Sequence, residues 1–296
     1  MTDLLATVVL AVHKDARARR TVEALRTQTV PAHQYEVVIV ENGTADLADL
    51  AEDPQVRHVF LPTANSARAR NAGLRTARGT YLLLTDADCV PAPDWIERLT
   101  ACLAESGAAA AGGAIDKAPP RTWAQRHAIT VVDGQRKLSY LPAMPLPYVA
   151  GANAGFVTAL LRAAGGFDED LKSGNDVDAC YRVGLNGGLV VVAPAAVVSH
   201  EDRASVAAHF HRFRHYAVYQ VLLYAKYKHL SGRRAVFDGY PFRRAAQALA
   251  GIPAAAAALA RADPGPASRS TLQLLEAAGV LCGTIQGAAT FRQPYL

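Results

Sequence analysis

Two aspartates at the end of an apolar run are the residues of this sequence best suited to chemistry. In the stretch YLLLTDAD, Asp86 and Asp88 follow residues 81–84, which have the pattern of a strand buried on both faces. The carboxyl ends of such strands are where open α/β sheets bind their ligands. Two close carboxylates repel each other, and a shared proton or a bound cation relieves the repulsion. The pair therefore indicates a metal site, with an aspartate turn as the evenly matched alternative.

The segments around this pair alternate between strand-like and helix-like patterns. Strand-like runs occur at 7–12, 36–40, 58–62 and 81–85, and helical periodicity fits 16–27, 66–77 and 94–106. This alternation predicts an α/β fold with a mostly parallel central sheet flanked by helices. In the second half we expect a buried strand within 108–115, helices near 123–137, 158–164 and from 175 to the glycines at 187–188, and a last strand that ends at His200.

The composition is that of a globular chain that can bury a sizeable core. Of the 296 residues, 51% are hydrophobic and 19% are charged, which excludes a disordered tail. The formal net charge of +5 suggests an anionic partner: a phosphate ligand, a lipid surface or nucleic acid. The four cysteines form no CxxC pair, so we expect neither a zinc site nor disulfides, and a reducing cytoplasm as the location.

The motifs of several common enzyme classes are missing. The first strand leads into HKDARARR rather than G-x-G-x-x-G, which argues against a Rossmann dinucleotide site. No GxxxxGK[ST] loop, G-x-S-x-G elbow or H-E-x-x-H helix occurs in the chain. A ligand that carries phosphate is therefore expected to bind through a metal and scattered basic side chains.

Four stretches, in this order and spacing, resemble the family 2 glycosyltransferases of GT-A fold: VVLAVHK, EVVIVENGTAD, ARNAGLRTARGTYLLLTDAD and GGFDEDLKSGNDVD. The resemblance covers about residues 5 to 202. It implies a GT-A-type nucleotide-diphospho-sugar transferase fold with a helical C-terminal appendage. We therefore predict a catalytic domain at 1–203, with a nucleotide-sugar half to about 112 and an acceptor half from about 113, followed by a helical region at 204–296.

The resemblance implies metal-dependent, inverting transfer of a sugar from a nucleotide-diphosphate sugar, with UDP as the expected nucleotide. Mn²⁺ or Mg²⁺ would stabilise the departing diphosphate, and such ions use only one or two protein carboxylates. Asp88 is the expected first metal ligand, and Asp86 is expected to reach the ribose or a metal-bound water. His200 is the expected further ligand; an imidazole suits Mn²⁺ better than Mg²⁺, and a surface histidine is the alternative.

Further donor contacts follow from the resemblance. Glu41 ends the second strand, where similar enzymes read the nucleobase, although this chain has Glu-Asn where the family more often has Asp-Asp. Arg70 suits the diphosphate or the base region, and Gly151-Ala152-Asn153 matches a segment that lines the donor sugar. The complete set of expected donor-binding residues is Ala11, His13, Glu41, Asn42, Arg70, Asp86, Ala87, Gly151 and Asn153.

The acceptor hydroxyl needs a general base, and the resemblance places it at Asp176 in GNDVD. Asp176 is predicted in the first turn of its helix, where the helix dipole favours the ionised carboxylate. Asp178 is the competing carboxylate, but two residues along a helix it should face elsewhere. The family usually has Glu-Asp here, and Asn175 takes the place of the glutamate.

The region after Ser205 is predicted to be helical and basic. It could contact a membrane surface, guide an anionic or lipid-linked acceptor, or pack on the catalytic domain. For the apolar segment Leu272–Phe291, which contains Glu276 and Gln286, we expect a packed terminal helix rather than a membrane span. No secretory signal is expected at the N-terminus, because no basic segment precedes the apolar run Leu4–Val12.

Two other functions stay open from the sequence. A sugar-phosphate nucleotidyltransferase shares this kind of sheet but needs glycines in the loop after the first strand, which HKDARARR lacks. A non-catalytic nucleotide-sugar-binding protein would not need the intact DAD and Asp176. The expected partners are the nucleotide-sugar donor and a small-molecule, glycan or lipid-linked hydroxyl acceptor, without nucleic acid and with peripheral membrane contact as an open alternative. The sequence leaves the oligomeric state undetermined.

Overall fold

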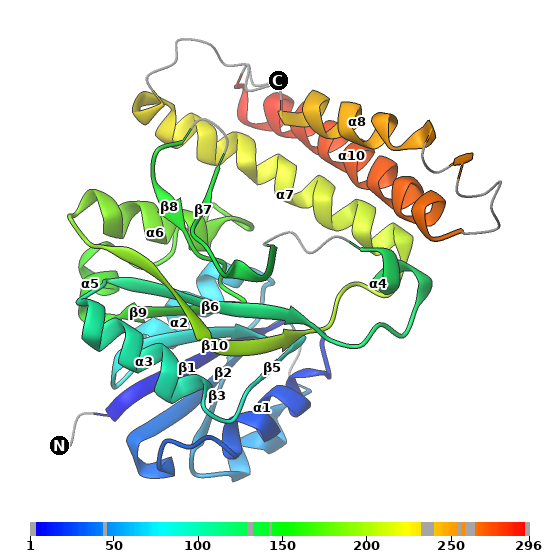
Figure 1. Ribbon diagram of the computed structural model, residues 1–296. Helices are drawn as coiled ribbons and strands as arrows, with labels where there is room; N and C mark the ends of the chain where they lie inside the picture. Colours follow the sequence, from blue (N-terminus) through cyan, green and yellow to red (C-terminus); the bar gives the residue numbers. More distant parts are fainter. Residues whose placement is uncertain are drawn as a thin grey trace. The chain divides into compact units, whose positions relative to one another are not determined.

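The computed structural model describes residues 4–43, 46–128, 133–141, 144–231, 240–253, 256–257 and 264–293 (Figure 1). The chain forms two compact units. The first contains Met1–Ala118, Val132–Tyr140 and Leu146–His200, and the second contains Pro119–Val131, Leu141–Pro145 and Glu201–Leu296. The division therefore falls at residue 200, three residues before the predicted boundary, and two short segments of the predicted acceptor half belong to the second unit.

The first unit is built on an eight-stranded sheet in the order β3-β2-β1-β4-β9-β6-β10-β5. Four of its seven neighbouring pairs are parallel and three are antiparallel, and β9 lies antiparallel between β4 and β6. The strands are β1 (Leu4–Val12), β2 (Tyr35–Asn42), β3 (Val56–Leu61), β4 (Gly79–Asp86), β5 (Cys89–Pro91), β6 (Ala110–Lys117), β9 (Asn153–Val157) and β10 (Val190–His200). A two-stranded ribbon pairs β7 (Ser139–Tyr140) with β8 (Pro147–Tyr148).

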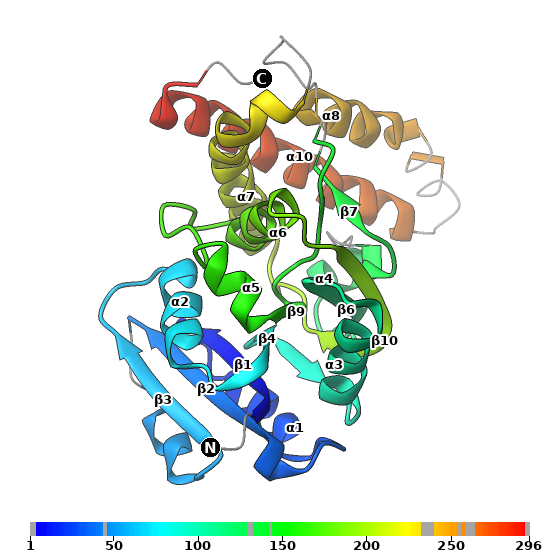
Figure 2. The same cartoon turned by 90° about the vertical axis from the view of Figure 1, so that its left-hand side faces the viewer.

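Helices cover both faces of this sheet, and this is why its central strands need no polar alternation. Every residue of β2 is buried. On one face, α1 (Ala18–Arg26) and α3 (Trp95–Ser106) pack through Val22 and Leu99 against the strand side chains that point to that face. The other face packs against α2 (Ser66–Thr76), α5 (Thr158–Ala163) and α6 (Asn175–Leu185) (Figure 2). Short 3₁₀ turns lie at Ala32–Gln34, Ala48–Glu52, Asp133–Gln135 and Lys228–Leu230.

Two strands of the sheet were not predicted, and one predicted strand is irregular. β9 and β5 have only five and three residues, and neither shows a recognisable alternation. In β10 the pairing with β6 shifts between Ala193 and Val197. Pro194 lies in that gap, and because proline has no N–H to donate to the ladder, a bulge is one of the few places where a strand accepts it. Of the predicted helix near 123–137, Trp123–His127 form α4, residues 129–132 lie outside the described residues, and Asp133–Gln135 form a 3₁₀ turn.

The described part of the second unit consists mainly of helices. It contains α4, α7 (Val206–Tyr227), α8 (Tyr240–Ala250) and α10 (Pro264–Phe291), and both views show α7, α8 and α10 side by side (Figures 1 and 2). Glycines at 279, 283 and 287 form one face of α10. A Cβ atom on them would lie within 3.0 Å of the backbone carbonyls of Phe210, Arg214 and Val218 on α7. This small-residue face therefore lets the two helix backbones touch.

Gly283→Leu is expected to destabilise the second unit by about 1–3 kcal/mol, the usual cost of overpacking, because even a Cβ would lie 2.8 Å from that of Ala217. Differential scanning calorimetry measures the change. The matched control is Gly184→Ala on α6, where the new Cβ would lie 3.9 Å from Leu146, in ordinary contact. That control should hold or raise the melting temperature, and an unchanged transition in Gly283→Leu would contradict the close packing of α7 and α10.

One helix among the described residues is long and apolar enough to cross a membrane by these two criteria alone, at Ser268–Phe291. Of its most apolar window, 39% is buried inside the protein. Glu276 in the same helix is fully buried and lies 3.6 Å from Nδ1 of the equally buried His209 on α7. In the structure this helix therefore packs against α7.

Candidate active site

The residues predicted to do chemistry gather at the carboxyl ends of β1, β2 and β4. These strands are parallel neighbours, and their register places Val12 beside Glu41 and Ala11 beside Asp86. Because parallel strands end at the same edge, the loops that follow them meet there. The structure thus brings the predicted donor residues of three separate sequence stretches to one edge of the sheet.

The three-residue strand β5 is what brings His200 to the aspartate pair. It runs antiparallel to β10, with His200 opposite Cys89, the residue directly after Asp88. As a result, Nε2 of His200 lies 3.7 Å from Oδ1 of Asp88. Asp88 is 7% exposed, so its carboxylate is largely removed from bulk water.

The side chains of Asp88 and His200 suit a divalent cation whose remaining coordination positions are filled by a bound phosphate ligand and water. Among the described residues, no group of three or more His, Cys, Asp or Glu side chains could hold a metal by itself. Asp88 and His200 offer one carboxylate and one imidazole, and their burial favours a positive charge that neutralises the aspartate. Mn²⁺ accepts both ligand types, and a phosphate ligand with water would complete the coordination of Mn²⁺ or Mg²⁺.

Arg17 is a site residue that the sequence analysis missed. Its Nη2 lies 2.7 Å from Oδ2 of Asp15 and 3.4 Å from Oδ2 of Asp88, so it adds a positive charge beside the predicted metal ligand. The hydroxyl of Thr21, one turn later, donates to the carbonyls of Ala87 and Cys89 and holds the aspartate loop against α1. The available signal was position: HKDARARR directly follows the first strand.

Arg70 connects the aspartate pair with the predicted acceptor half. Its Nη2 lies 3.4 Å from Oδ1 of Asp86, and its Nη1 donates to Oδ1 of Asn175 over 2.7 Å. Asn175 is 2% exposed and also donates to the carbonyl of Leu171. Asn175, which stands where the resembled family usually has a glutamate, fixes the orientation of Arg70 through its amide oxygen. Because this amide is neutral, the positive charge of Arg70 remains available to Asp86.

The environment of Asp86 raises the pKa of its carboxyl. The first cause is that surrounding protein displaces water from the group, although 40% of the side chain reaches solvent. Arg70 opposes the rise through its positive charge, while Asp88 and Asp176 add to it through repulsion. Asp176 therefore lies close enough to the aspartate pair to act on it electrostatically.

Asp176 and Asp178 differ in what they can reach. Oδ2 of Asp176 accepts the Gly151 N–H over 2.7 Å, and the residue remains partly exposed. Asp178 is fully buried, and its Oδ2 pairs with Arg182 at 2.8 Å. The helix thus leaves the Asp176 carboxylate at Gly151 and commits that of Asp178 to its own packing. Asp176 as the general base stays a prediction.

Gly151 is the point where these groups meet. A Cβ at this position would lie 2.7 Å from Cζ and 2.8 Å from Nη1 of Arg70, so only a glycine lets the guanidinium approach the loop without displacement. Since the same residue donates its N–H to Asp176, Gly151 fixes the arginine and the carboxylate relative to each other.

Glu41 is engaged by the protein itself. It is 1% exposed, and its carboxylate accepts the backbone N–H groups of Asp46 and Leu47 and lies 2.8 Å from Nε2 of His58. The sequence analysis predicted that Glu41 contacts the nucleobase. In the structure its carboxylate binds backbone N–H groups that follow β2. His58 had no signal in the sequence, because it lies within a strand.

Two neighbours of Glu41 also have defined places. Asn42 is buried and ties the end of β1 to the start of α2, since it donates to the Val12 carbonyl and accepts from the Asn65 N–H. His13 is exposed at the strand end, and its Nδ1 contacts the Asn42 carbonyl. Of these two predicted donor-binding residues, His13 is therefore exposed to solvent. Asn42 is buried and holds the backbone around it.

Asn153, Ala87 and Ala11 support the site from behind or beside it. Asn153 is fully buried; its amide donates to the Ala114 and Ala196 carbonyls, and its Oδ1 accepts from Nε1 of Trp95. The Asn153 side chain thus holds the strands together and is not exposed to a ligand. Ala87 is buried between the two aspartates, and Ala11 is partly exposed in β1. Gln135, which the sequence analysis missed, bonds to the Ala150 N–H.

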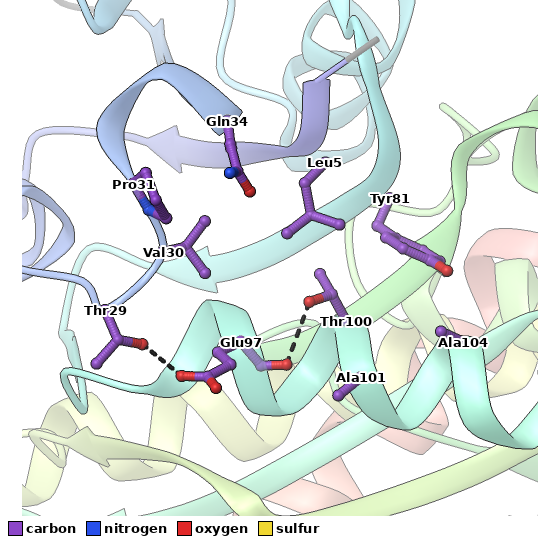
Figure 3. Close-up of a pocket in the computed structure, with 10 residues that line it drawn as sticks. All are labelled: Leu5, Thr29, Val30, Pro31, Gln34, Tyr81, Glu97, Thr100, Ala101 and Ala104. Carbon is purple, nitrogen blue, oxygen red and sulfur yellow. Dashed lines mark hydrogen bonds between the residues drawn. The ribbon is translucent and has the colours of Figure 1, made fainter.

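An open cavity of 430 Å³ lies elsewhere in the first unit (Figure 3). Leu5 of β1 and Tyr81 of β4 line it, so it lies toward the amino ends of strands whose carboxyl ends carry the site. Two of its polar side chains donate within the protein: Thr29 to Oε2 of Glu97 over 2.7 Å, and Thr100 to the Ile96 carbonyl. It offers no grouping of charged side chains for a phosphate ligand and is separate from the candidate active site.

Comparison with known sequences gives a consistent result. The sequence model described as Glycosyl transferase family 2 matches residues 7–164. The pre-mycofactocin glycosyltransferase of Mycobacterium tuberculosis is 29% identical over 212 residues, which cover 68% of this chain and 43% of that protein. The validoxylamine A glucosyltransferase of Streptomyces hygroscopicus subsp. limoneus is 25% identical over 224 residues, with 62% and 48% covered. The chain thus spans less than half the length of these curated relatives.

Comparison with solved structures concerns the fold. The mannosyltransferase PcManGT from Pyrobaculum calidifontis, solved in complex with GDP-Man and Mn²⁺, matches with a TM-score of 0.64 and 21% identity, over 95% of this chain and 86% of that one. TarS of S. aureus matches with a TM-score of 0.53 and 18% identity, over 74% and 40%. These likenesses confirm the predicted GT-A-type α/β fold.

Proposed function

The chain belongs to glycosyl transferase family 2, and on that basis we propose that it moves a sugar from a nucleotide-diphosphate sugar to a hydroxyl acceptor. The observation that carries the proposal is the path from Asp88 and Asp86 through Arg70 and Gly151 to Asp176. It joins a cation site for a leaving diphosphate to a carboxylate that can take a proton, and direct displacement needs both together.

We propose that Asp88 and His200 hold Mn²⁺ or Mg²⁺, with Mn²⁺ favoured by the imidazole. The ion would supply positive charge to the leaving diphosphate. Arg17 and Arg70 flank the aspartates and are suited to bind further phosphate oxygens, because guanidinium groups match their geometry. The PcManGT complex, which contains GDP-Man and Mn²⁺, supports a shared need for a donor and a divalent ion.

In the proposed reaction the acceptor oxygen forms a bond to the anomeric carbon as the bond from that carbon to the phosphate oxygen breaks. The leaving diphosphate keeps the bonding electron pair, and the acceptor proton passes to Asp176. The Gly151 N–H fixes one carboxylate oxygen of Asp176, so the proton is aimed at a carboxylate of fixed orientation. Attack opposite the leaving group inverts the anomeric configuration.

The experiment that tests this function is calorimetry with UDP-, GDP- and dTDP-sugars, with and without Mn²⁺, followed by an assay for release of the sugar. We expect UDP-sugars to bind first, with GDP-mannose as the next candidate. Metal-dependent binding followed by release of the nucleoside diphosphate supports a glycosyltransferase. Formation of a nucleoside triphosphate from the donor and pyrophosphate would instead favour a nucleotidyltransferase, and binding without turnover by any acceptor would favour a binding protein.

Gly151→Ala is expected to lower sugar transfer about 10- to 100-fold, because the new Cβ displaces the Arg70 guanidinium from Asp86 and Asn175. The fold should survive, since alanine meets only the end of a side chain. Transfer kinetics and donor affinity measure the effect, with Gly184→Ala as the matched control. Equal kinetics in both variants would show that the position of Arg70 does not matter for transfer.

A further inference from the structure

Trp123 is the only tryptophan of this chain that reaches solvent. The sequence contains 2 tryptophans, and Trp95 is fully buried while Trp123 of α4 is 42% exposed. Single apolar side chains are common on protein surfaces, so exposure by itself does not indicate a binding site. A fixed ring, an available arginine and a strong positive charge in the second unit together indicate one.

The indole ring of Trp123 is held in place by two contacts. Its Nε1 donates to Oγ of Ser268 on α10 over 3.2 Å, and the centroid of the His127 ring lies 5.2 Å from that of the indole at an interplanar angle of 53°. The bond to Ser268 engages the only polar atom of the Trp123 side chain. What remains exposed is therefore mainly apolar ring surface, which suits a ligand with an apolar face.

The short helix that carries Trp123 is fixed by a capping box and a buried glutamine. Thr122 accepts the Gln125 N–H, and the Gln125 side chain accepts the N–H groups of Arg121 and Thr122. Gln125 is 6% exposed, and its Nε2 also donates to the Asp202 carbonyl over 2.8 Å. Because a helix of only 5 residues is not stable alone, these bonds determine where the indole lies. The ring is thus preorganised, which lowers the entropic cost of binding a ligand.

Arg126 places a positive charge beside the ring. It follows Trp123 by one helical turn, so the two side chains are neighbours on the surface of α4. Arg126 is exposed, and within the described ranges of the chain its guanidinium takes part in no hydrogen bond or ion pair. Arg121, which precedes the helix, lies by contrast 3.8 Å from Glu201. An anionic group at the ring could thus pair with Arg126 without displacing a described carboxylate from it.

The second unit as a whole is strongly basic. Its segments contain 14 Lys and Arg against 5 Asp and Glu, a formal net charge of +9, whereas the first unit contains 17 against 21, a net charge of −4. Of the carboxylates that the structure describes in the second unit, Asp202 and Glu276 are buried, and the Glu201 side chain is 17% exposed. A surface charge of this sign attracts an anionic ligand and disfavours a cationic one.

We propose that Trp123 and Arg126 form a binding site for an acidic saccharide. The face of a sugar ring carries C–H bonds and its hydroxyls lie at the edge, so the face can stack on the indole without burying a polar group. A carboxylate or phosphate group of the same saccharide pairs with the Arg126 guanidinium, whose planar fork matches both anions. The proposal concerns binding by the second unit and is independent of the sugar-transfer proposal.

Two other anionic partners fit the same surface less well. A bilayer needs an apolar stripe along a helix, whereas Ala124, Gln125 and Ala128 are buried and leave the indole as the large apolar group that α4 exposes. Single-stranded nucleic acid is bound by several aromatic rings that stack successive bases, and Trp123 is the only exposed aromatic side chain of α4. One ring with one adjacent guanidinium matches a single acidic sugar unit.

Acrylamide quenching of tryptophan fluorescence tests the site on the full chain without donor or metal. Because Trp95 is buried, the quenched emission comes mainly from Trp123. The acidic probes are a hyaluronan tetrasaccharide, whose sugars alternate glucuronate with N-acetylglucosamine, and glucose phosphate; chitotetraose and glucose are their neutral counterparts. We expect the acidic probes to protect Trp123 from quenching, less so as salt rises, and to bind about fivefold more tightly than the neutral ones. The tighter of the two acidic probes identifies the anionic group as a carboxylate or a phosphate.

Calorimetry with the tetrasaccharides separates the roles of the two side chains. Trp123→Ala should weaken binding of both tetrasaccharides about tenfold, and Trp123→Phe should restore part of the loss, because a smaller ring still stacks. Arg126→Gln should weaken binding of the acidic tetrasaccharide about fivefold and leave that of the neutral one unchanged. The matched controls are Phe60→Ala, which removes an aromatic ring that is 49% exposed in the first unit, and Arg75→Gln, which removes an exposed arginine there. Both controls should bind as the unchanged chain does.

The inference is overturned if no saccharide probe binds, if the acidic and neutral probes bind equally, or if Trp123→Ala binds as well as Phe60→Ala. An oligothymidylate that binds more tightly than the acidic tetrasaccharide would assign the surface to nucleic acid instead. Circular dichroism should show that all variants stay folded; Arg126→Gln tests the site even if Trp123→Ala disturbs α4, since the bonds that fix the helix do not use that guanidinium. Asp88→Ala should bind the acidic tetrasaccharide normally, which separates this result from any failure of the donor site.

Discussion

Asp176→Asn is expected to slow sugar transfer by about two to four decades while the chain keeps its fold and its donor affinity. The acceptor hydroxyl must lose a proton as it attacks, and an amide cannot accept that proton. The asparagine carbonyl can still accept the Gly151 N–H, so the loop that holds Arg70 stays in place. The measurement is transfer to the acceptor found by screening, or donor hydrolysis in its absence, beside calorimetric donor affinity.

Asp170→Asn serves as the control, because it removes a carboxylate of the same charge from an exposed position six residues earlier. Its transfer rate should match that of the unchanged chain. Asp178 cannot replace Asp176 as base, since it is fully buried and paired with Arg182. Near-normal turnover in Asp176→Asn would remove it from the mechanism, and a loss of donor affinity equal to the loss of rate would assign it to binding instead.

The elements of the first unit could be predicted where local pattern and burial agree. The run YEVVIVEN forms a strand with every residue buried, as an apolar run between helices predicts. β9 could not be found in this way, because NAGFV is short and its two smallest residues serve close packing. A Cβ at Gly155 would lie 3.0 Å from side-chain carbons of Leu83 and Leu103. Such a strand is specified by its neighbours rather than by its own sequence.

The candidate site divides in the same way. Asp88, His200 and Asp176 could be proposed because each stands at the end of a strand or the start of a helix in a motif of recognisable order. That His200 reaches Asp88 depends on three antiparallel residue pairs between β5 and β10, which no local pattern indicates. Contacts from side chains that lie more than a hundred residues away, such as Arg70 with Asn175, are likewise a product of the tertiary fold.

Two side chains that were predicted to bind the sugar donor form hydrogen bonds within the protein instead. A glutamate and an asparagine at the site edge looked alike in the sequence as polar groups near a ligand. In the fold, Glu41 is nearly buried and accepts the N–H groups of Asp46 and Leu47. Asn153 is fully buried and donates to carbonyls of two strands, at Ala114 and Ala196. Buried polar groups must be satisfied, and the demand is met before any ligand arrives. Burial, which the sequence does not show, thus separates groups that shape the site from groups that can touch a ligand.

Asp88→Ala is expected to abolish the metal dependence of donor binding, with a loss of donor affinity of about 100-fold or more in the presence of Mn²⁺. Asp88 is the buried carboxylate nearest to both His200 and Arg17, so its removal takes away the negative charge that would hold the cation. The loop should keep its shape, because Arg17 remains paired with Asp15 through two hydrogen bonds between their side chains, and Thr21 still holds the Ala87 carbonyl.

Electron paramagnetic resonance of Mn²⁺ with a nucleoside diphosphate measures binding of the ion directly, without any turnover. The unchanged chain should shift the spectrum of the Mn²⁺–nucleotide complex, and Asp88→Ala should leave that spectrum as it is without protein. Asp94→Ala, which removes a partly exposed aspartate six residues later, should behave as the unchanged chain does. His200→Ala is expected to weaken Mn²⁺ more than Mg²⁺, because only the first favours an imidazole ligand. Full Mn²⁺ affinity in Asp88→Ala would mean that groups other than Asp88 hold the ion, and it would remove Asp88 as the metal ligand.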